Sequence, residues 1–124
     1  MKIAIIGSRK LNIKTEEIKR ELEKITELKN IKAIVSGGAT GADQAAKTTA
    51  KELNIKYIEY KPKYNKYPNK IAPLERNKEI IENSDFILAF WDGTSKGTQH
   101  ALSEAVKQGK ATKTINKSYT KSLF

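Results

Sequence analysis

The chain has 124 residues, with 24 lysines and arginines against 14 acidic residues and a formal net charge of +10 at pH 7. This length fits one domain with its own core, and the absence of cysteine excludes a disulfide scaffold and a thiolate metal site. The apolar run at residues 3–6 is too short for a secretory signal, and no later run is long enough to cross a bilayer. We therefore expect a cytoplasmic protein with no membrane partner.

Two strands and an amphipathic helix are predicted before the second glycine-rich segment. Residues 2–6 and 31–35 are short β-rich runs that are typical of strands. Thr15 predicts the N-cap of a helix between them, because the acids Glu16 and Glu17 suit its first turn. The apolar face of this helix repeats through Ile18, Leu22, Ile25 and Leu28.

The rest of the chain continues the alternation. An alanine-rich helix is predicted to end at Leu53, a strand follows at residues 56–60, and a proline-containing loop spans 61–73. Pro73 suits the start of a helix. The remaining predicted elements are that helix to about residue 83, a strand at 85–90, a helix at 98–108 closed by Gly109, a strand at 111–115 and a loose tail from 117.

Strands that alternate with helices predict parallel strands joined by right-handed crossovers. These strands are continuous apolar runs, as expected for a sheet that is covered on both faces. We predict an α/β fold, a single-domain three-layer Rossmann-like sandwich with a mostly parallel sheet of about five strands. The domain is expected to span residues 1–116, and residues 117–124 form a basic C-terminal tail.

The positive charge is concentrated in two segments. Residues 54–70 hold five lysines and one glutamate, and residues 107–124 hold five lysines and no acid. The rest of the chain is nearly neutral. A basic segment is typical of nucleic-acid binding, but a composition rich in lysine, asparagine and isoleucine throughout explains the excess equally well.

Three loops that follow predicted strands are rich in glycine or small residues, at residues 7–9, 36–43 and 91–98. Parallel strands all end at one edge of a sheet, where the following helices begin, so these loops should converge there. Glycines allow close approach of a ligand, and helix N-termini offer free N–H groups. The chain lacks both the G-x-G-x-x-G and Walker A motifs, which excludes the ordinary dinucleotide and P-loop classes. We predict a phosphate-binding crevice.

Two arginines are candidates for the phosphate contact. Arg9 follows the first strand, at the mouth of the crevice. Arg76 is expected in the first turn of its helix, where a cation opposes the helix dipole and an anion would remove the conflict. The alternative for Arg76 is a salt bridge to Glu75 or Glu79.

Other polar and aromatic residues near this edge have two interpretations each. Asp43 either stabilises the dipole of its helix or accepts a ribose hydroxyl, and Trp91 either stacks on a base or covers the sheet edge. Lys96 is a candidate phosphate contact. His100 is the only histidine, and a lone histidine is more often structural than catalytic.

Aromatic and basic residues alternate in the loop that precedes the third helix. Tyr64 and Tyr67 lie among four lysines there, Lys61, Lys63, Lys66 and Lys70. This pattern is typical of single-strand binding by stacking and charge. A lid or an oligomer contact is the interpretation we favour for a long loop of this kind.

Taken in order, these motifs resemble a known family. They are Gly7-Ser8-Arg9, the loop from Ser36 to Asp43, Arg76-Asn77, and the run from Asp85 through Trp91-Asp92-Gly93-Thr94-Ser95-Lys96-Gly97-Thr98. The set resembles the small stand-alone SLOG proteins over residues 1–110. That Rossmann-like superfamily includes cytokinin-activating phosphoribohydrolases, DNA-processing proteins of transformation and the ligand-sensing domains of Thoeris antiphage effectors. The resemblance implies a nucleotide or ADP-ribose-type ligand and a homodimer or larger assembly.

The resemblance differs between branches of the superfamily. Arg76 matches an arginine of the phosphoribohydrolases, which also place glutamates soon after a Gly-Thr pair. Here Gly97-Thr98 is followed by Gln99 and His100, and the next acid is Glu104. This departure argues against N-glycosidic hydrolysis, whereas the 36–43 loop resembles the DNA-processing branch.

We therefore expect a binding module, a sensor or sequestering protein for a nucleotide-derived phosphorylated small molecule (nucleotide, cyclic nucleotide or ADP-ribose type), as in antiphage signalling. The alternatives are N-glycosidic cleavage of a nucleoside monophosphate, with Glu104 or Asp43 as the acid, and single-stranded nucleic-acid binding. No metal or cofactor is expected, and no catalytic residue is assigned. The expected ligand-binding residues are Gly7, Ser8, Arg9, Ser36, Gly37, Gly38, Thr40, Gly41, Asp43, Arg76, Asn77, Trp91, Gly93, Thr94, Ser95, Lys96, Gly97 and Thr98.

Overall fold

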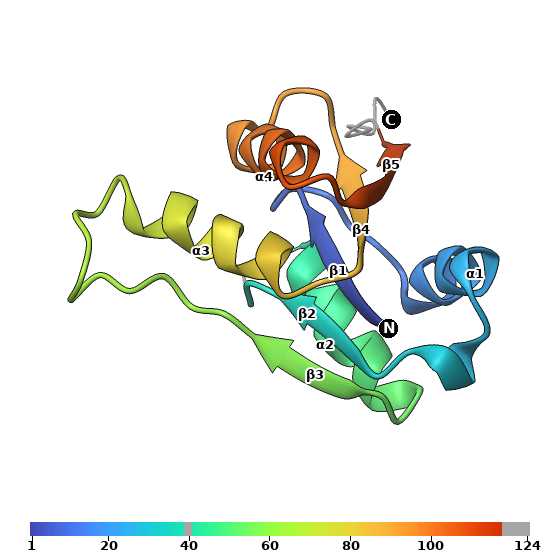
Figure 1. Ribbon diagram of the computed structural model, residues 1–124. Helices are drawn as coiled ribbons and strands as arrows, with labels where there is room; N and C mark the ends of the chain where they lie inside the picture. Colours follow the sequence, from blue (N-terminus) through green and yellow to red (C-terminus); the bar gives the residue numbers. More distant parts are fainter. Residues whose placement is uncertain (39–40, 118–124) are drawn as a thin grey trace, which may run out of the picture.

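The computed structural model describes residues 1–38 and 41–117, so Thr40 and the tail from residue 118 lie outside the described residues. Strands and helices alternate along the chain (Figure 1). The elements are β1 (Lys2–Gly7), α1 (Thr15–Ile25), the 3-10 turn η1 (Leu28–Asn30), β2 (Ala33–Ser36), α2 (Ala42–Glu52), β3 (Lys56–Glu59), α3 (Ala72–Glu82), β4 (Phe86–Trp91), α4 (Lys96–Lys107) and β5 (Ala111–Asn116).

The five strands form one sheet in the order β3-β2-β1-β4-β5, and every neighbouring pair is parallel. The predicted Rossmann-like α/β fold is confirmed. The chain moves outward from β1 to β3, then returns to β4 on the other side of β1. The order therefore reverses between β1 and β4, the place where open parallel sheets bind ligands beyond the carboxyl ends of their strands.

Helices cover both faces of the sheet because side chains of each strand alternate between the faces. In β1, Ile3 and Ile5 pack with α1 and α2, whereas Ala4 and Ile6 pack with α3 and α4. These strand side chains are buried. The two apolar clusters hold the sheet between two helical layers, so the strand ends have fixed positions.

Two predicted helix starts are wrong by one or two residues. Thr15 is the first residue of α1 rather than its cap, because the carbonyl of Lys14 already accepts from the N–H groups of Glu17 and Ile18. Glu16 and Glu17 do occupy the first turn. The last helix begins at Lys96, two residues earlier than predicted, because Ser95 is its N-cap and accepts from the Thr98 N–H.

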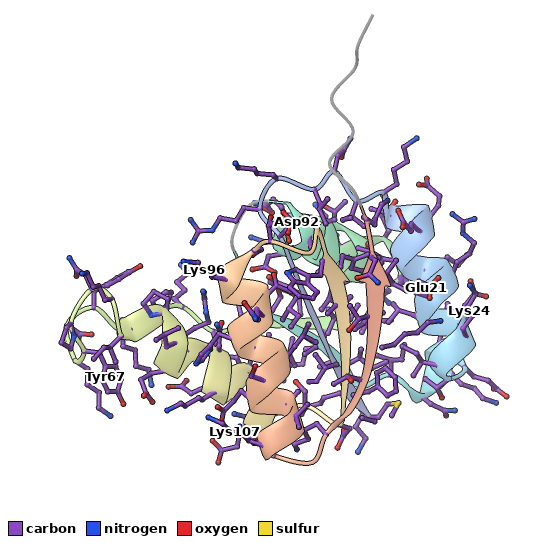
Figure 2. All side chains as sticks on the ribbon, turned by 90° about the horizontal axis from the view of Figure 1, so that it is seen from above. Glu21, Lys24, Tyr67, Asp92, Lys96 and Lys107 are labelled. Atoms are coloured by element: carbon purple, nitrogen blue, oxygen red, sulfur yellow. The ribbon has the colours of Figure 1, made fainter. Side chains whose placement is uncertain are left out.

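The segment between β3 and α3 forms an arm that projects away from the body of the molecule (Figure 1). Figure 2 shows Tyr67 of this arm on the side opposite to Glu21 and Lys24 of α1. At the other edge of the sheet, Lys113 and Lys117 of the basic segment form ion pairs with Glu21 (2.8 Å) and Glu17 (2.6 Å). In residues 1–38 and 41–117, no helix has the length and apolar character needed to traverse a bilayer.

Candidate functional site

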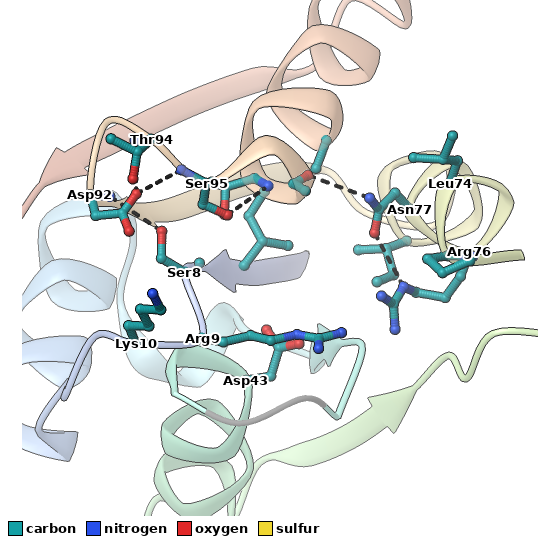
Figure 3. Close-up of a pocket in the computed structure, with 17 residues that line it drawn as sticks. Ser8, Arg9, Lys10, Asp43, Leu74, Arg76, Asn77, Asp92, Thr94 and Ser95 are labelled. Atoms are coloured by element: carbon teal, nitrogen blue, oxygen red, sulfur yellow. Dashed lines mark hydrogen bonds between the residues drawn. The ribbon is translucent and has the colours of Figure 1, made fainter. Parts of the chain in front are cut away.

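A pocket of about 490 Å³ opens at the carboxyl edge of the sheet, at the switch between β1 and β4 (Figure 3). Three cations and two carboxylates line it, together with small polar and apolar groups. The lining residues are Ile6, Gly7, Ser8, Arg9, Lys10, Asp43, Pro73, Leu74, Arg76, Asn77, Ile80, Asp92, Thr94, Ser95, Gly97, Thr98 and Ala101. Its volume lies within the range of small-molecule sites.

The end of β1 supplies one wall of the pocket. Gly7 allows α2 to pack closely, since a Cβ at this position would lie 2.5 Å from the Cβ of Ala42. Ser8 is buried, and its Oγ accepts from the N–H of Asp92 at 3.2 Å, which joins this loop to the one after β4. The next two side chains, Arg9 and Lys10, are exposed and line the pocket.

Arg76 faces the same pocket from α3, one residue beyond the first turn. Its Nη1 donates to the carbonyl of Gly37 at 3.2 Å, and its Nε donates to Oδ1 of Asn77 at 3.1 Å. Burial lowers the pKa of Arg76, the carboxylate of Asp43 opposes this shift, and the charge of Arg9 adds to it. Figure 3 shows Arg9 extending across Asp43 toward Arg76. Two guanidinium groups therefore converge on a partly desolvated space.

The two salt bridges considered for Arg76 do not form. Glu75 pairs with Lys78 at 3.2 Å, and Glu79 pairs with Lys63 of the arm at 3.2 Å. Lysines thus take both neighbouring carboxylates, and Arg76 is left directed at the pocket.

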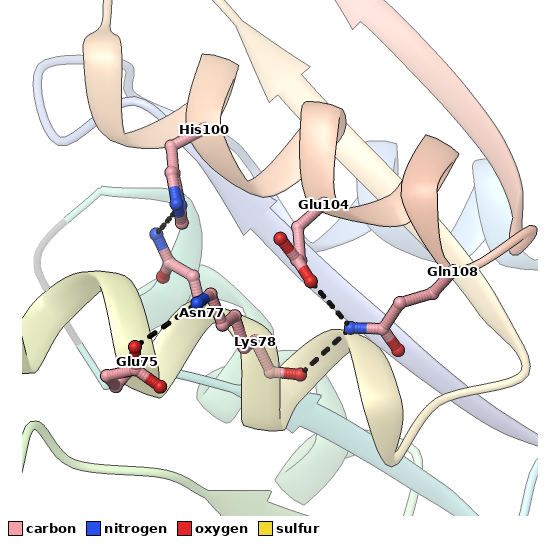
Figure 4. A network of polar contacts seen from close by, with 6 residues as sticks. All are labelled: Glu75, Asn77, Lys78, His100, Glu104 and Gln108. Atoms are coloured by element: carbon pink, nitrogen blue, oxygen red, sulfur yellow. Dashed lines mark hydrogen bonds and ion pairs between the residues drawn. The ribbon is translucent and has the colours of Figure 1, made fainter.

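Asn77 connects Arg76 to α4, and Figure 4 shows its contact with His100. Its Nδ2 donates to the carbonyl of Gly97 at 3.5 Å and lies 3.4 Å from Nδ1 of His100. Glu104 is outside the pocket and accepts instead from Gln108 at 3.2 Å, between α3 and α4. Of the two acids considered for hydrolysis, Asp43 alone lines the pocket.

The loop after β4 is built around Asp92. Its Oδ1 accepts from the N–H groups of Thr94 (2.9 Å) and Ser95 (2.8 Å), and these hydrogen bonds hold the pKa of Asp92 below its usual range. Ser95 then caps α4, whose first turn contains no acid. Gly97 lines the pocket and has open space beside its Cα. The positive end of the α4 dipole therefore faces the pocket.

Glycines of the loop after β2 pack against residues that line the pocket. A Cβ at Gly37 would lie 2.6 Å from Nη1 of Arg76, and one at Gly38 would lie 2.4 Å from the Glu59 carboxyl group. Gly41 has φ +74°, and a Cβ there would lie 2.6 Å from the carbonyl oxygen of Arg9. These glycines make room for other protein atoms, and Asp43 follows them into the pocket wall.

The structure brings ten of the predicted site residues together in the pocket lining. They are Gly7, Ser8, Arg9, Asp43, Arg76, Asn77, Thr94, Ser95, Gly97 and Thr98. Ser36, Gly37, Gly38, Gly41, Trp91, Gly93 and Lys96 are not lining residues, and Thr40 lies outside the described residues. The Trp91 indole donates to the carbonyl of Ser95 at 3.1 Å.

Sequence reasoning did not assign Lys10, Leu74 and Asp92 to the site, although all three line the pocket, as do the apolar residues Ile6, Pro73, Ile80 and Ala101. Lys10 directly follows Arg9, and Asp-Gly-Thr-Ser before a helix is a recognisable Asx-turn signal, so two of the three were detectable. Nothing in the sequence distinguishes Leu74 from other helix residues. The described residues contain no cluster of three or more histidine, aspartate or glutamate side chains that could hold a metal ion.

The family model for DNA recombination-mediator protein A matches residues 1–89, which include β1 through most of β4. The matched part contains Arg9, Asp43 and Arg76, whereas the Asp92 loop and α4 follow it. No curated protein matches the chain. Because the match covers more than half of the chain, and the fold agrees with it, this protein belongs to the DNA recombination-mediator protein A family, within the Rossmann-like SLOG superfamily.

Proposed function

We propose that the protein binds a nucleotide-derived phosphorylated small molecule in this pocket and acts as a sensor or sequestering protein. The convergence of Arg9 and Arg76 on one pocket carries the proposal. Like charges repel, and burial removes part of the water that would screen Arg76. A phosphate dianion would relieve both costs.

In this proposal the phosphate would lie between Arg9 and Arg76, with Lys10 and the backbone of Gly97 at the start of α4 beside it. The N–H groups of a first helical turn lack intrahelical partners, and the helix dipole favours an anion there. The charge of Lys96 at the first helical position opposes that dipole. An anion would therefore stabilise this end of α4, and Lys96 would contact it from the rim.

Asp43 provides the contact for the sugar. A carboxylate only accepts hydrogen bonds, so it suits hydroxyl groups and repels phosphate. Asp43 is buried and close enough to Arg76 to influence the pKa of that arginine. A ribose bound between Asp43 and the phosphate would put its hydroxyl groups next to the carboxylate and leave the phosphate next to the cationic side chains.

Binding without hydrolysis fits the state of the acids other than Asp43, one outside the pocket and one in its lining. Glu104 is engaged between helices, and Asp92 is held ionised by two N–H groups, which makes it a poor general acid. Incubation with nucleoside monophosphates should therefore release no free base above background by chromatography. Steady release that is abolished by Asp43→Asn would contradict a pure binding function.

Calorimetry with adenosine 5′-monophosphate, adenosine 3′,5′-cyclic monophosphate and ADP-ribose tests the proposal. Loss of a charge-assisted hydrogen bond costs about 1.5–3 kcal/mol, so Arg9→Ala and Arg76→Ala should each weaken binding roughly tenfold or more. The matched control is Arg20→Ala, on the exposed side of α1 and outside the pocket. Sedimentation of the same samples checks the homo-oligomer expected from the resemblance. Absence of binding to all three ligands, or unchanged affinity in both pocket variants, would refute the proposal.

Single-stranded DNA is the second candidate, favoured by the family match. Against it, Lys113 and Lys117 are engaged with acids of α1. Filter binding of a thymidine oligonucleotide across a salt series distinguishes the two. A steep salt dependence that disappears when residues 117–124 are removed, together with no mononucleotide binding, would favour DNA.

A further inference from the structure

A chain of side-chain contacts runs from His100 of α4 through Asn77 of α3 to Arg76. Nε of Arg76 donates to Oδ1 of Asn77 at 3.1 Å. At the other end of the same amide, Nδ2 of Asn77 lies 3.5 Å from the carbonyl oxygen of Gly97 and 3.4 Å from Nδ1 of His100. Asn77 is only 9% exposed, and Figure 4 shows it directed from α3 toward His100. Its amide therefore links the pocket arginine to α4.

Two partners of Asn77 fix which way its amide points. An amide oxygen only accepts hydrogen bonds, and an amide nitrogen only donates. The guanidinium of Arg76 is always a donor, and the carbonyl of Gly97 is always an acceptor. Exchange of the two ends of the amide would place donor against donor at Arg76 and acceptor against acceptor at Gly97. Both contacts thus select the orientation in which Nδ2 faces α4.

The orientation of this amide decides the role of His100. Nδ1 of the imidazole faces the Nδ2 donor of Asn77, so Nδ1 accepts and carries no proton. The hydrogen of the neutral ring is then on Nε2. His100 is not a lining residue of the pocket. Its connection to the pocket passes through Asn77.

Arg76 is held at two points on its guanidinium. Nε is bonded to Asn77, and Nη1 donates to the carbonyl of Gly37 at 3.2 Å. These two contacts leave the other N–H groups of the guanidinium for a phosphate. A side chain that is ordered before its ligand arrives loses less conformational entropy on binding. The contacts with Asn77 and Gly37 therefore prepare Arg76 for an anion.

We propose that Asn77 and His100 are positioning residues, which hold Arg76 in place for the phosphate instead of contacting the ligand. This inference rests on the proposed function, in which Arg76 binds the phosphate. Asn77 lines the pocket, but both ends of its amide are engaged by protein groups. His100 lies outside the pocket, so its influence on nucleotide affinity passes through Arg76.

Calorimetry with adenosine 5′-monophosphate, at about pH 8 where a free imidazole is neutral, tests the role of His100. His100→Leu removes the acceptor and should lower affinity about three- to tenfold, because Arg76 then becomes ordered only on binding. His100→Asn supplies an acceptor oxygen near the position of Nδ1 and should restore affinity to within about twofold of wild type.

The matched control is Gln108→Leu. Gln108 is a second polar bridge between α4 and α3, since its Nε2 donates to the carbonyl of Lys78 at 3.5 Å. It is not a lining residue of the pocket, and Figure 4 shows it farther along α4 than His100. Its removal should leave affinity within about twofold of wild type, because Arg76 keeps both of its contacts.

The coupling between His100 and Arg76 separates positioning from a structural role. In a chain that already carries Arg76→Ala, His100→Leu should change nucleotide affinity by less than about twofold, because the group that His100 positions is gone. A structural effect of His100 on α4 would persist in that background. Circular dichroism checks that each variant folds.

The chain has a single histidine, so its imidazole signals are unambiguous in nitrogen NMR spectra of labelled protein. Nδ1 should appear as an unprotonated nitrogen and Nε2 as a protonated one. Asn77→Ala should shift the Nδ1 signal, because it removes the donor that faces this nitrogen. A proton on Nδ1 of the neutral ring in the wild-type protein would refute the inference.

The remaining outcomes also contradict the positioning role. Unchanged affinity in His100→Leu, or an equal loss with and without Arg76→Ala, would mean that His100 does not act on Arg76. An equal loss in Gln108→Leu would assign the effect to looser packing of α3 against α4. Failure of the wild-type protein to bind the nucleotide would refute the proposed function itself, and the positioning role with it.

Discussion

The loops after β2 and after β4 both contain glycines and both end at the pocket, yet their glycines serve different purposes. Gly37, Gly38 and Gly41 lie against other protein atoms, at distances that leave no room for a side chain. Gly93 and Gly97 have open space around them. The first loop therefore positions protein groups, Arg76 above all, whereas the second leaves backbone exposed to a ligand. A glycine-rich motif alone does not reveal which of these it does.

The largest effect should come from alanine at Gly41, where crowding by backbone atoms is combined with a positive φ. Gly41 has φ +74° and ψ −125°, a conformation that side-chain-bearing residues rarely adopt, and a Cβ would lie 2.6–2.7 Å from two backbone carbonyl oxygens. Strain and overlap together should cost Gly41→Ala roughly 2–5 kcal/mol of unfolding free energy. Gly93→Ala, at φ +84° but in open space, should cost only about 1–2 kcal/mol. Urea unfolding measures both values. If Gly41→Ala and Gly93→Ala lose the same unfolding free energy, the two loops do not differ in this way.

The sequence predicts the individual strands and helices better than it predicts the order of the strands in the sheet. Apolar runs and capping residues predict each strand and helix, because these depend on neighbours a few residues away. The position of β4 beside β1 depends on contacts between Ile3, Ile5, Leu88 and Phe90 across more than eighty residues. No local pattern encodes that pairing, so the switch point that creates the pocket emerges only in three dimensions.

The sequence predicted that the site lies at the carboxyl edge of the sheet, but it predicted the individual side chains of the site less well. Arg9 and Arg76 were expected at the carboxyl edge and lie there. Trp91 was expected near a ligand as one alternative, but its indole donates to the next turn of its own loop. Leu74 went unnoticed because its role depends on how α3 approaches β1. The docking of helices and the contacts that side chains make within a loop decide which side chains enter a pocket. The sequence can show that a turn forms, as at Asp92, but it does not show these contacts.

A variant of intermediate effect tests the difference between the two loops by nucleotide affinity rather than by stability. In Gly37→Ala, the new methyl group would displace the Arg76 guanidinium, which is the flexible end of a long side chain. Stability should fall by less than about 1 kcal/mol, while affinity for adenosine 5′-monophosphate should fall about tenfold with the loss of a charge-assisted contact.

The companion variant of the second loop is Gly97→Ala. Alanine is favoured over glycine within a helix, so stability should rise by about 0.5 kcal/mol. The methyl group would occupy space beside the pocket and lower nucleotide affinity several-fold. Thermal unfolding and calorimetry should therefore give opposite signs for this variant. An unchanged affinity would place the ligand away from the α4 N-terminus.

The smallest predicted effect concerns acid and the loop after β4. The pKa of Asp92 is held below its ordinary value of 3.8, first by the Thr94 N–H and then by the Ser95 N–H. A carboxyl group whose pKa is lower in the folded state stabilises that state above its unfolded pKa, and this contribution disappears as pH falls through the folded pKa. Asp92→Asn keeps an oxygen acceptor but removes the charge, so wild type and variant should differ most above about pH 5, and the difference should begin to shrink as pH falls below about 4. Urea midpoints between pH 7 and pH 3 measure this, with Glu23→Gln, an exposed acid on α1, as the control. A wild-type-to-variant difference that stays constant with pH would mean that the charge of Asp92 does not hold the loop, and that its hydrogen-bond geometry alone presents the α4 N-terminus to the pocket.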